Sequence, residues 1–404
     1  MLLKLLFVIG LFLLYFVMRD KGKEKEYFYL TIIMFVMREM NVPVFGSITP
    51  STVMIFAILI GSLSKISIYL RQHGIYIITL LFAVTIGLLT TDFNFARVSE
   101  WALLLSSVVV ISSICQHYIQ TEEDLRTLTK CIVAVCFIFS ITTIMAYYGL
   151  ADGTVIISSY DISNADNYYA SRVYGITFSN LVQVISVISI CILPILNSRK
   201  KWVEYLLIIV FVYAALITLK RMSFIAMVIA LLYYLRRQVE IRNFKVVLIV
   251  TALCVAFIYI WWEPLMYRFS IAGFGTGVVT DHSTQTRFDR INFAIDAFKQ
   301  SPLFGMGAGY AIYIHNGFFE ILANCGIIGI CTVFLKLIPG IKDIMRKNPY
   351  AVSAFIYLIT CVSLEAAISK AQTIYFLGLF LGGYYASKDI ESLNDYQQED
   401  YGEK

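Results

Sequence analysis

The feature that most constrains this chain is a series of long apolar segments that recurs from one end to the other. A helix needs roughly 17–25 apolar residues to cross about 30 Å of hydrocarbon. Backbone polar groups in lipid must bond within such a segment, so each segment is expected to be a helix. The expected spans are residues 2–18, 27–43, 51–70, 75–90, 101–118, 131–150, 176–196, 203–219, 222–235, 246–262, 317–340, 351–368 and 371–386. The pattern predicts an all-α polytopic membrane protein with about 12–13 transmembrane helices.

Composition agrees with this fold class. Hydrophobic residues make up 59% of the chain and charged residues 15%, and the mean hydropathy is +0.76, which excludes ordinary soluble domains. Basic cytoplasmic loops account for the net charge of +5, so no nucleic-acid partner is expected. The eight cysteines lie in or at the ends of apolar spans and show no disulfide framework. The four histidines show no metal-ligand spacing, so no metal site or cofactor is expected.

The expected domain organisation is a single transmembrane domain, residues 1–386, followed by an acidic, Tyr-rich cytoplasmic tail, residues 387–404. The first segment lacks a small-residue cleavage site and is expected to be a retained anchor. A bent or re-entrant segment is expected within 27–43, which carries charges, or within 203–235, which is short for two crossings. Basic loops mark the cytoplasmic side, and they are residues 19–25, 199–201, 236–245 and 342–347. The N-terminus then lies outside, although one miscounted early span would reverse it.

Two expected outer loops are long, residues 151–175 and 263–316. Long loops in compact proteins are commonly functional. The first loop is rich in Asp, Ser, Asn and Tyr, which suits a hydroxyl-rich ligand such as a sugar and equally suits a solvated linker. The second contains residues 287–299, a pattern typical of a helix lying in the membrane interface. Its expected apolar face consists of Phe288, Ile291, Ile295 and Phe298.

Basic residues at the outer membrane level are exceptions to the positive-inside pattern. Arg287 and Arg290 lie one turn apart at the start of the interfacial helix, where two guanidinium groups can fork onto a phosphate or extend to lipid headgroups. Arg172 and Arg221 fall at the same level. Together these side chains would line a basic cavity suited to a lipid-linked pyrophosphate. The glycines of 305–309 could hold phosphate through backbone N–H groups, but without a P-loop Lys a tight turn is expected.

The span after the second loop begins with a polar stripe. Asn316, Glu320 and Asn324 recur at a spacing of four, which places them on one helical face. A polar stripe is costly in lipid, so it should face a cavity or polar partners. His315 precedes it, and an imidazole there can exchange a proton near neutral pH, or simply cap the helix or contact water. Gly326 and Gly329 are expected to permit close helix packing.

Four patches of the chain together resemble the integral-membrane O-antigen polymerases and O-antigen ligases, with the related capsule polymerases. They are residues 172–180, 218–223, 287–309 and 315–329. His315-Asn316 followed by the two glycines resembles a signature of that family's outer loop. The chain departs from the pattern at Ser179-Asn180, where the family often has Asn-Pro-Asn, at Lys220, often Ser, and at Ile291, often Trp.

The resemblance implies a GT-C-like, metal-independent glycosyltransferase of the bacterial inner (plasma) membrane, with its active site on the periplasmic or outer face. Its partners would be an undecaprenyl-pyrophosphate-linked oligosaccharide, membrane lipid and a chain-length regulator protein. A polymerase would move the glycan onto the next lipid-linked repeat unit, and a ligase would move it onto lipid A-core. The looser match to the ligase-like patches favours the polymerase. A transporter or flippase for the same oligosaccharide is the alternative from another class, although no internal repeat is apparent.

The chemistry of these residues also supports a hypothesis for the mechanism. His315 would act as the catalytic general base on the attacking sugar hydroxyl, with Glu320 beside it as the second catalytic residue. Arg221 and Arg287 would hold the pyrophosphate as it leaves, with Arg172 and Arg290 as second choices. The full set of expected substrate-binding residues is Arg172, Asn180, Arg221, Arg287, Arg290 and Asn316.

Overall fold

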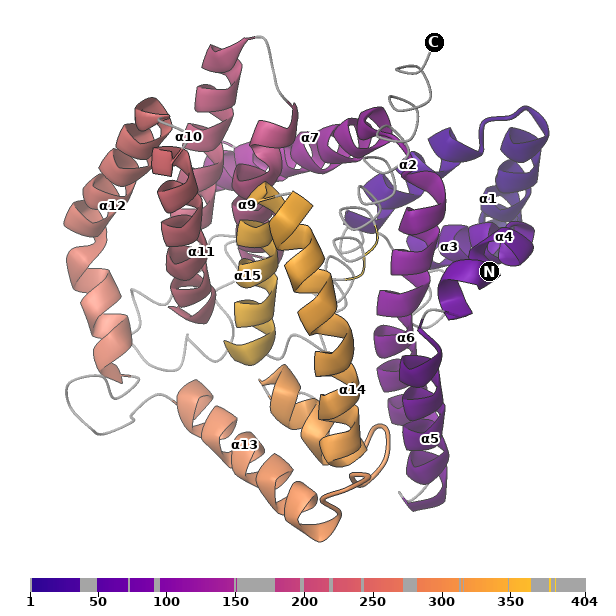
Figure 1. The fold of residues 1–404 in the computed structure, drawn as a ribbon. Helices are drawn as coiled ribbons and strands as arrows, with labels where there is room; N and C mark the ends of the chain where they lie inside the picture. Colours follow the sequence, from indigo (N-terminus) through magenta and orange to yellow (C-terminus); the bar gives the residue numbers. More distant parts are fainter. Residues whose placement is uncertain are drawn as a thin grey trace, which may run out of the picture.

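The computed structural model describes residues 2–36, 49–71, 73–90, 95–148, 150, 179–196, 200–217, 221–240, 243–271, 282–311, 314, 316–347, 349–364, 378 and 382. Within these ranges the regular elements are helices, and none of the described residues forms a strand (Figure 1). The expected all-α class is therefore confirmed for this part of the chain. The expected loop 151–175 and the tail 387–404 lie outside the described residues.

The helices follow the apolar segments of the sequence. In the first half they are α1 Leu2–Asp20, α2 Glu24–Val36, α3 Pro50–Gly61, α4 Leu63–Arg71, α5 Gly74–Thr90, α6 Phe95–Tyr118 and α7 Glu122–Tyr147. In the second half they are α9 Ser179–Ile192, the 3-10 helix η3 Leu193–Leu196, α10 Lys201–Ile217, α11 Arg221–Glu240, α12 Phe244–Ile271, α13 His282–Gln300, α14 Gly317–Lys347 and α15 Pro349–Leu364. Residues 263–271, expected in the outer loop, continue α12 instead.

Among the described helices, α7 is long and apolar enough to cross a membrane alone, and α3 with α4 could form a second such segment. Shorter apolar helices cover Gly74–Leu89, Val182–Leu196, Phe244–Ala256, Gly317–Val333 and Ala351–Ser363. One or two long apolar helices also occur in soluble proteins, so their lengths alone do not establish the polytopic arrangement.

Helices α3 and α4 divide the segment 51–70, which was expected as one span, with a bend of 94°. The bend lies at Ser62, whose hydroxyl is 2.6 Å from the Tyr15 hydroxyl and 3.2 Å from the Tyr118 hydroxyl. Arg19 donates to the carbonyl of Gly61 at 2.8 Å. A Cβ at Gly61 would overlap the Tyr15 ring. Contacts from α1 and α6 thus fix this bend, which lies in a segment expected to be one span and not in 27–43 or 203–235, where a bent segment was expected.

The main core is built around α9, which packs against α7, α10, α11 and α15. Residues Val182–Ile192 of α9 are buried throughout, as expected for a helix surrounded by other helices. Small hydroxyl side chains lie in this interface. The Oγ atoms of Ser140 in α7 and Ser186 in α9 are 3.3 Å apart. Figure 1 shows α9, α11 and α15 side by side above α13 and the start of α14.

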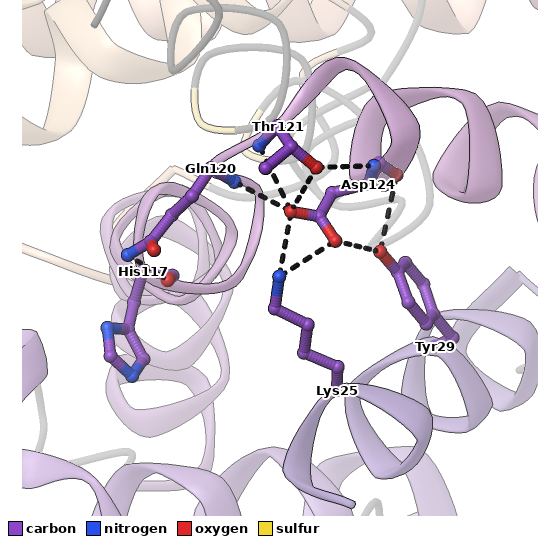
Figure 2. A network of polar contacts seen from close by, with 6 residues as sticks. All are labelled: Lys25, Tyr29, His117, Gln120, Thr121 and Asp124. Atoms are coloured by element: carbon purple, nitrogen blue, oxygen red, sulfur yellow. Dashed lines mark hydrogen bonds and ion pairs between the residues drawn. The ribbon is translucent and has the colours of Figure 1, made fainter. Parts of the chain in front are cut away.

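A polar clamp, consisting of Lys25, Tyr29, Thr121 and Asp124, fastens α2 to the start of α7 (Figure 2). Lys25 Nζ donates to the two carboxylate oxygens of Asp124 at 2.9 and 2.8 Å, and Tyr29 donates at 3.2 Å. Thr121 and Asp124 form a reciprocal capping box. Burial alone would raise the pKa of Asp124, but hydrogen bonds from Lys25, Thr121 and the Gln120 N–H lower that pKa below its ordinary value.

Candidate functional site

Helix α13 presents one face to the protein and one to its surroundings. The buried positions are Ala294 and Ala297, which pack with Ala311, Ile314 and Ala323. The expected apolar face is only partly buried, and Phe288 on it is 55% exposed. The packed face is therefore rotated away from the one that hydrophobicity predicts, because the small alanines allow the closest approach to the following segment and to α14.

Arg287 and Arg290 lie on the packed side of α13. They precede Ala294 by seven and four residues and Ala297 by ten and seven, spacings that repeat on one helical face. Both side chains are half-buried, whereas Phe288 and Asp289 beside them are exposed. The arginines thus lie on the side of α13 whose alanines pack against Ala311, Ile314 and Ala323.

The glycine segment, residues 302–309, forms turns at 302–304 and 308–309, as expected, and lies against a break in α14. Helix α14 is broken at Gly326, whose φ of 62° and ψ of −160° are non-helical. The backbone groups freed by the break bond to the glycine segment in both directions. Those bonds are Met306 N to Ala323 O at 2.8 Å, Gly307 N to Asn324 O at 3.1 Å, Ile327 N to Pro302 O at 2.9 Å and Ile328 N to Leu303 O at 3.3 Å.

A phosphate cradle in this segment is not supported. The N–H groups of Met306 and Gly307 donate to α14, and the N–H of Ala308 donates to the carbonyl of Ala83 in α5 at 2.7 Å. Gly305, Gly307 and Gly309 have φ of 72°, 94° and 80°, a region that favours glycine. A Cβ at Gly307 would overlap the backbone of Gly87. The alternating glycines therefore allow the backbone of this segment to contact the backbones of α5, α6 and α14.

Asn324, fully buried on α14, holds the segment that follows. Its Oδ1 accepts from Ala311 N at 3.1 Å, and its Nδ2 donates to Ala311 O at 2.6 Å and to Glu320 O at 2.7 Å. The carboxamide thus forms a reciprocal pair of hydrogen bonds with one residue of the loop. The expectation that the polar stripe meets polar partners is confirmed at this position.

Asn316 caps α14. Its Oδ1 accepts from the N–H groups of Phe318 and Phe319, both at 3.1 Å, and its Nδ2 donates to the carbonyl of Ser363 near the end of α15 at 2.6 Å. Its amide is therefore engaged in joining two helices, and these bonds do not support direct substrate binding. Glu320, one turn further along α14, is fully buried.

Four expected site residues are described only in part or not at all. Arg172 and His315 lie outside the described residues. Asn180 and Arg221 lie in the first turns of α9 and α11, and their side chains are outside what is described. Helices α11 and α12 pack against each other and follow one another in the chain, joined by residues 241–243. The start of α11 and the end of α12 at Ile271 therefore lie at the same end of this helix pair. Figure 1 shows the lower ends of α11 and α15 facing α13.

Nothing among the described side chains resembles a metal centre, since no three His, Cys, Asp or Glu side chains gather there. Metal independence remains a prediction. Arg287 and Arg290 form a half-buried arginine face on α13. The neighbouring segment is held by Asn324 and ends at Asn316. Such an arrangement suits binding of an anionic group.

Sequence reasoning missed two structural roles here. It placed Asn324 in a stripe without identifying Ala311 as its partner, and it did not predict that the turns of the glycine segment contact α5, α6 and α14. One signal in the sequence was the set of three alternating glycines followed by Gly326 in the next span. Glycine adopts positive φ readily and lets two backbones come into contact. The arginine face could have been found from the small residues Ala294 and Ala297 at helical spacing.

The described residues form an all-helical fold of membrane-protein composition, with Arg287 and Arg290 on α13 and Glu320 in the first turn of α14. These features define the class as a helical protein with a polar site beside its apolar bundle. Residues 206–334 match the family model described as O-Antigen ligase. This match confirms the resemblance to the O-antigen polymerase and ligase family, whose members are membrane proteins and glycan-transferring enzymes. The matched region contains Arg221, Arg287, Arg290, His315, Asn316 and Glu320 and leaves Arg172 and Asn180 outside. No curated protein sequence matches the chain.

Proposed function

We propose that this protein is a polysaccharide polymerase of the O-antigen or capsule type. It would transfer a glycan from undecaprenyl pyrophosphate onto a lipid-linked repeat unit at the outer face of the inner membrane. The observation that carries the proposal is the arginine face of α13, which packs toward the segment ending at Asn316 within the family-matched region. A polytopic GT-C-like bundle of residues 1–386 with a cytoplasmic tail is part of the same proposal.

In the proposed reaction the hydroxyl oxygen of the acceptor sugar attacks the anomeric carbon of the donor. The bond from that carbon to the pyrophosphate oxygen breaks, and its electron pair leaves with the pyrophosphate. His315 accepts the hydroxyl proton, and the buried Glu320 orients the imidazole. Pyrophosphate is a good leaving group, so charge neutralisation and positioning supply most of the catalysis.

Arg221 and Arg287 are proposed to neutralise the departing pyrophosphate, with Arg172 and Arg290 as further contacts. Two half-buried guanidinium groups one turn apart on α13 support this assignment, because partial burial strengthens charge-assisted hydrogen bonds to phosphate. Asn180 remains proposed for acceptor binding. Asn316 is reassigned to positioning, since its amide caps α14 and bonds to α15.

The test is turnover of a lipid-pyrophosphate oligosaccharide by the purified full-length protein in nanodiscs. His315→Ala is expected to lower kcat by about 100-fold or more, the usual contribution of a general base. Arg287→Ala should raise KM and lower kcat, and Arg287→Lys should recover part of the loss because it keeps the charge.

Lys299→Ala is the matched control, because this exposed residue on α13 pairs only with the exposed Asp296 among the described residues. Native activity in His315→Ala would remove the proposed base, and native activity in both Arg221→Ala and Arg287→Ala would remove the pyrophosphate site.

A ligase that transfers the finished glycan to lipid A-core is the second candidate, favoured by the description of the matched family. The length of surface glycan in a deletion strain separates the two. Single repeat units attached to lipid A-core indicate a lost polymerase, whereas long polymer retained on undecaprenyl pyrophosphate indicates a lost ligase. Loss of surface glycan with repeat units held at the cytoplasmic face would instead indicate a flippase.

A further inference from the structure

An aromatic pair lies on the outside of the candidate site. The rings of Phe293 on α13 and Tyr310 after the glycine segment are stacked, with centroids 5.5 Å apart and an interplanar angle of 12°. Tyr310 is partly buried against the cluster of Ala294, Ala297 and Ala311. Phe293 remains 47% exposed. Tyr310 thus anchors the ring of Phe293, and much of the Phe293 surface stays accessible.

Exposed carboxylates flank this pair. Asp289 precedes Phe293 by one turn of α13, and Asp296 follows it by one turn, so all three share a side of the helix. Asp296 accepts from Lys299 at 2.9 Å, and both side chains are more than half exposed, so water screens this ion pair and leaves it weak. An aromatic surface between hydrogen-bonding groups is the composition of a ligand site.

A sugar ring fits this chemistry. Its C–H groups carry partial positive charge and are attracted to the negative face of an aromatic ring, while its hydroxyls donate to carboxylates. Lipid fits less well, since two carboxylates on the same side would have to be desolvated at an apolar surface. The lipid-facing role suits Phe288 better, because it lies on the opposite side of α13 beside Ile291 and Ile295.

The position of the pair relates it to the proposed reaction. Arg290 lies one turn before Phe293 on α13, and Tyr310 precedes Ala311, the residue that Asn324 holds. We propose that Phe293 and Tyr310 form a glycan subsite that stacks against a sugar ring of the lipid-linked oligosaccharide next to its pyrophosphate. The identity of this ligand rests on the proposed function.

Binding of the native repeat-unit oligosaccharide, released from its pyrophosphate carrier by mild acid, provides the test. The soluble sugar is titrated against the full-length protein in nanodiscs, with Phe293→Ala, Phe293→Leu and Phe293→Trp as variants and Phe288→Leu as the matched control. Phe293 is exposed, so these variants should fold, which their melting temperatures check. Loss of one aromatic contact should weaken binding about fivefold to tenfold in the Ala and Leu variants. Trp should keep the affinity, and Phe288→Leu should leave it unchanged.

Native affinity in Phe293→Leu would show that only an apolar group is needed there, as at a lipid surface, and would overturn the subsite. Equal weakening in Phe288→Leu, or no binding by the wild type, would overturn it as well. Turnover of the intact lipid-linked substrate by the wild type is a separate readout. Sugar binding with the expected variant pattern but no turnover would contradict the proposed function and leave the subsite standing.

Discussion

Asn324 is the single residue that most clearly connects the site to the fold. Its three hydrogen bonds tie Ala311 to α14 and to the carbonyl of Glu320. Ala311 lies four residues before the proposed base His315, so its anchoring limits where the loop can go. A buried amide held by three hydrogen bonds is rigid, whereas an apolar side chain of similar size would leave the N–H and C=O of Ala311 without these partners.

Asn324→Leu is therefore expected to destabilise the protein by about 2–4 kcal/mol, because Ala311 N–H and C=O would be buried unsatisfied. Thermal unfolding in detergent measures the change. Asn292→Leu, at an exposed position of α13, should alter the melting temperature little. Equal melting temperatures for Asn324→Leu and the wild type would show that the loop does not depend on this amide.

At the scale of elements, the break in α14 matters most for the site. A regular helix would have used the carbonyls of Ala323 and Asn324 internally, but the break at Gly326 releases them to Met306 and Gly307. The glycine segment can approach so closely because Gly305, Gly307 and Gly309 lack a Cβ at the points of contact. Two segments that contribute candidate residues are thereby joined through their backbones rather than through side chains.

Gly307→Ala tests this contact. The added Cβ would overlap the backbone of Gly87, and the φ of 94° is unfavourable for alanine. The variant is expected to lose about 1–3 kcal/mol of stability, with loss of activity from displacement of the loop. Gly74→Ala is the control, because no atom lies within 4 Å of its added Cβ. A stable, active Gly307→Ala would contradict the close contact of the loop with α5.

At the scale of the whole molecule, side-chain contacts between distant segments decide how the helices are assembled. Lys25 and Asp124 are 99 positions apart and form the ion pair of the polar clamp. Tyr15, Arg19 and Tyr118 fix the bend between α3 and α4. These contacts join α1, α2, α3, α6 and α7, so they set the frame of the N-terminal half of the fold.

The clamp should make stability depend on pH. Asp124 has a lowered pKa in the folded protein, so its contribution is present above the unfolded value of about 3.9 and is lost as pH falls through the folded pKa. Asp124→Asn should therefore lower stability by about 1–3 kcal/mol at pH 7, the range for hydrogen bonds to charged groups, and differ little from the wild type at acid pH.

Melting temperatures across pH 2–7 check this expectation, with Glu122→Gln as control because its i,i+4 pair with Arg126 is exposed. A constant difference between Asp124→Asn and the wild type over this range would contradict the linkage.

The sequence by itself determined the helical class, the positions of most helices and the region of the candidate site, because apolar periodicity and helix-compatible residues are local properties of the chain. It also predicted a helix over 287–299, which α13 confirms. Tertiary structure decided the bend at Ser62, the break at Gly326, the packed face of α13 and the partners of Asn316 and Asn324. Each of these depends on a segment remote in sequence that supplies a hydrogen bond or leaves space for a backbone, and no local pattern identifies that partner.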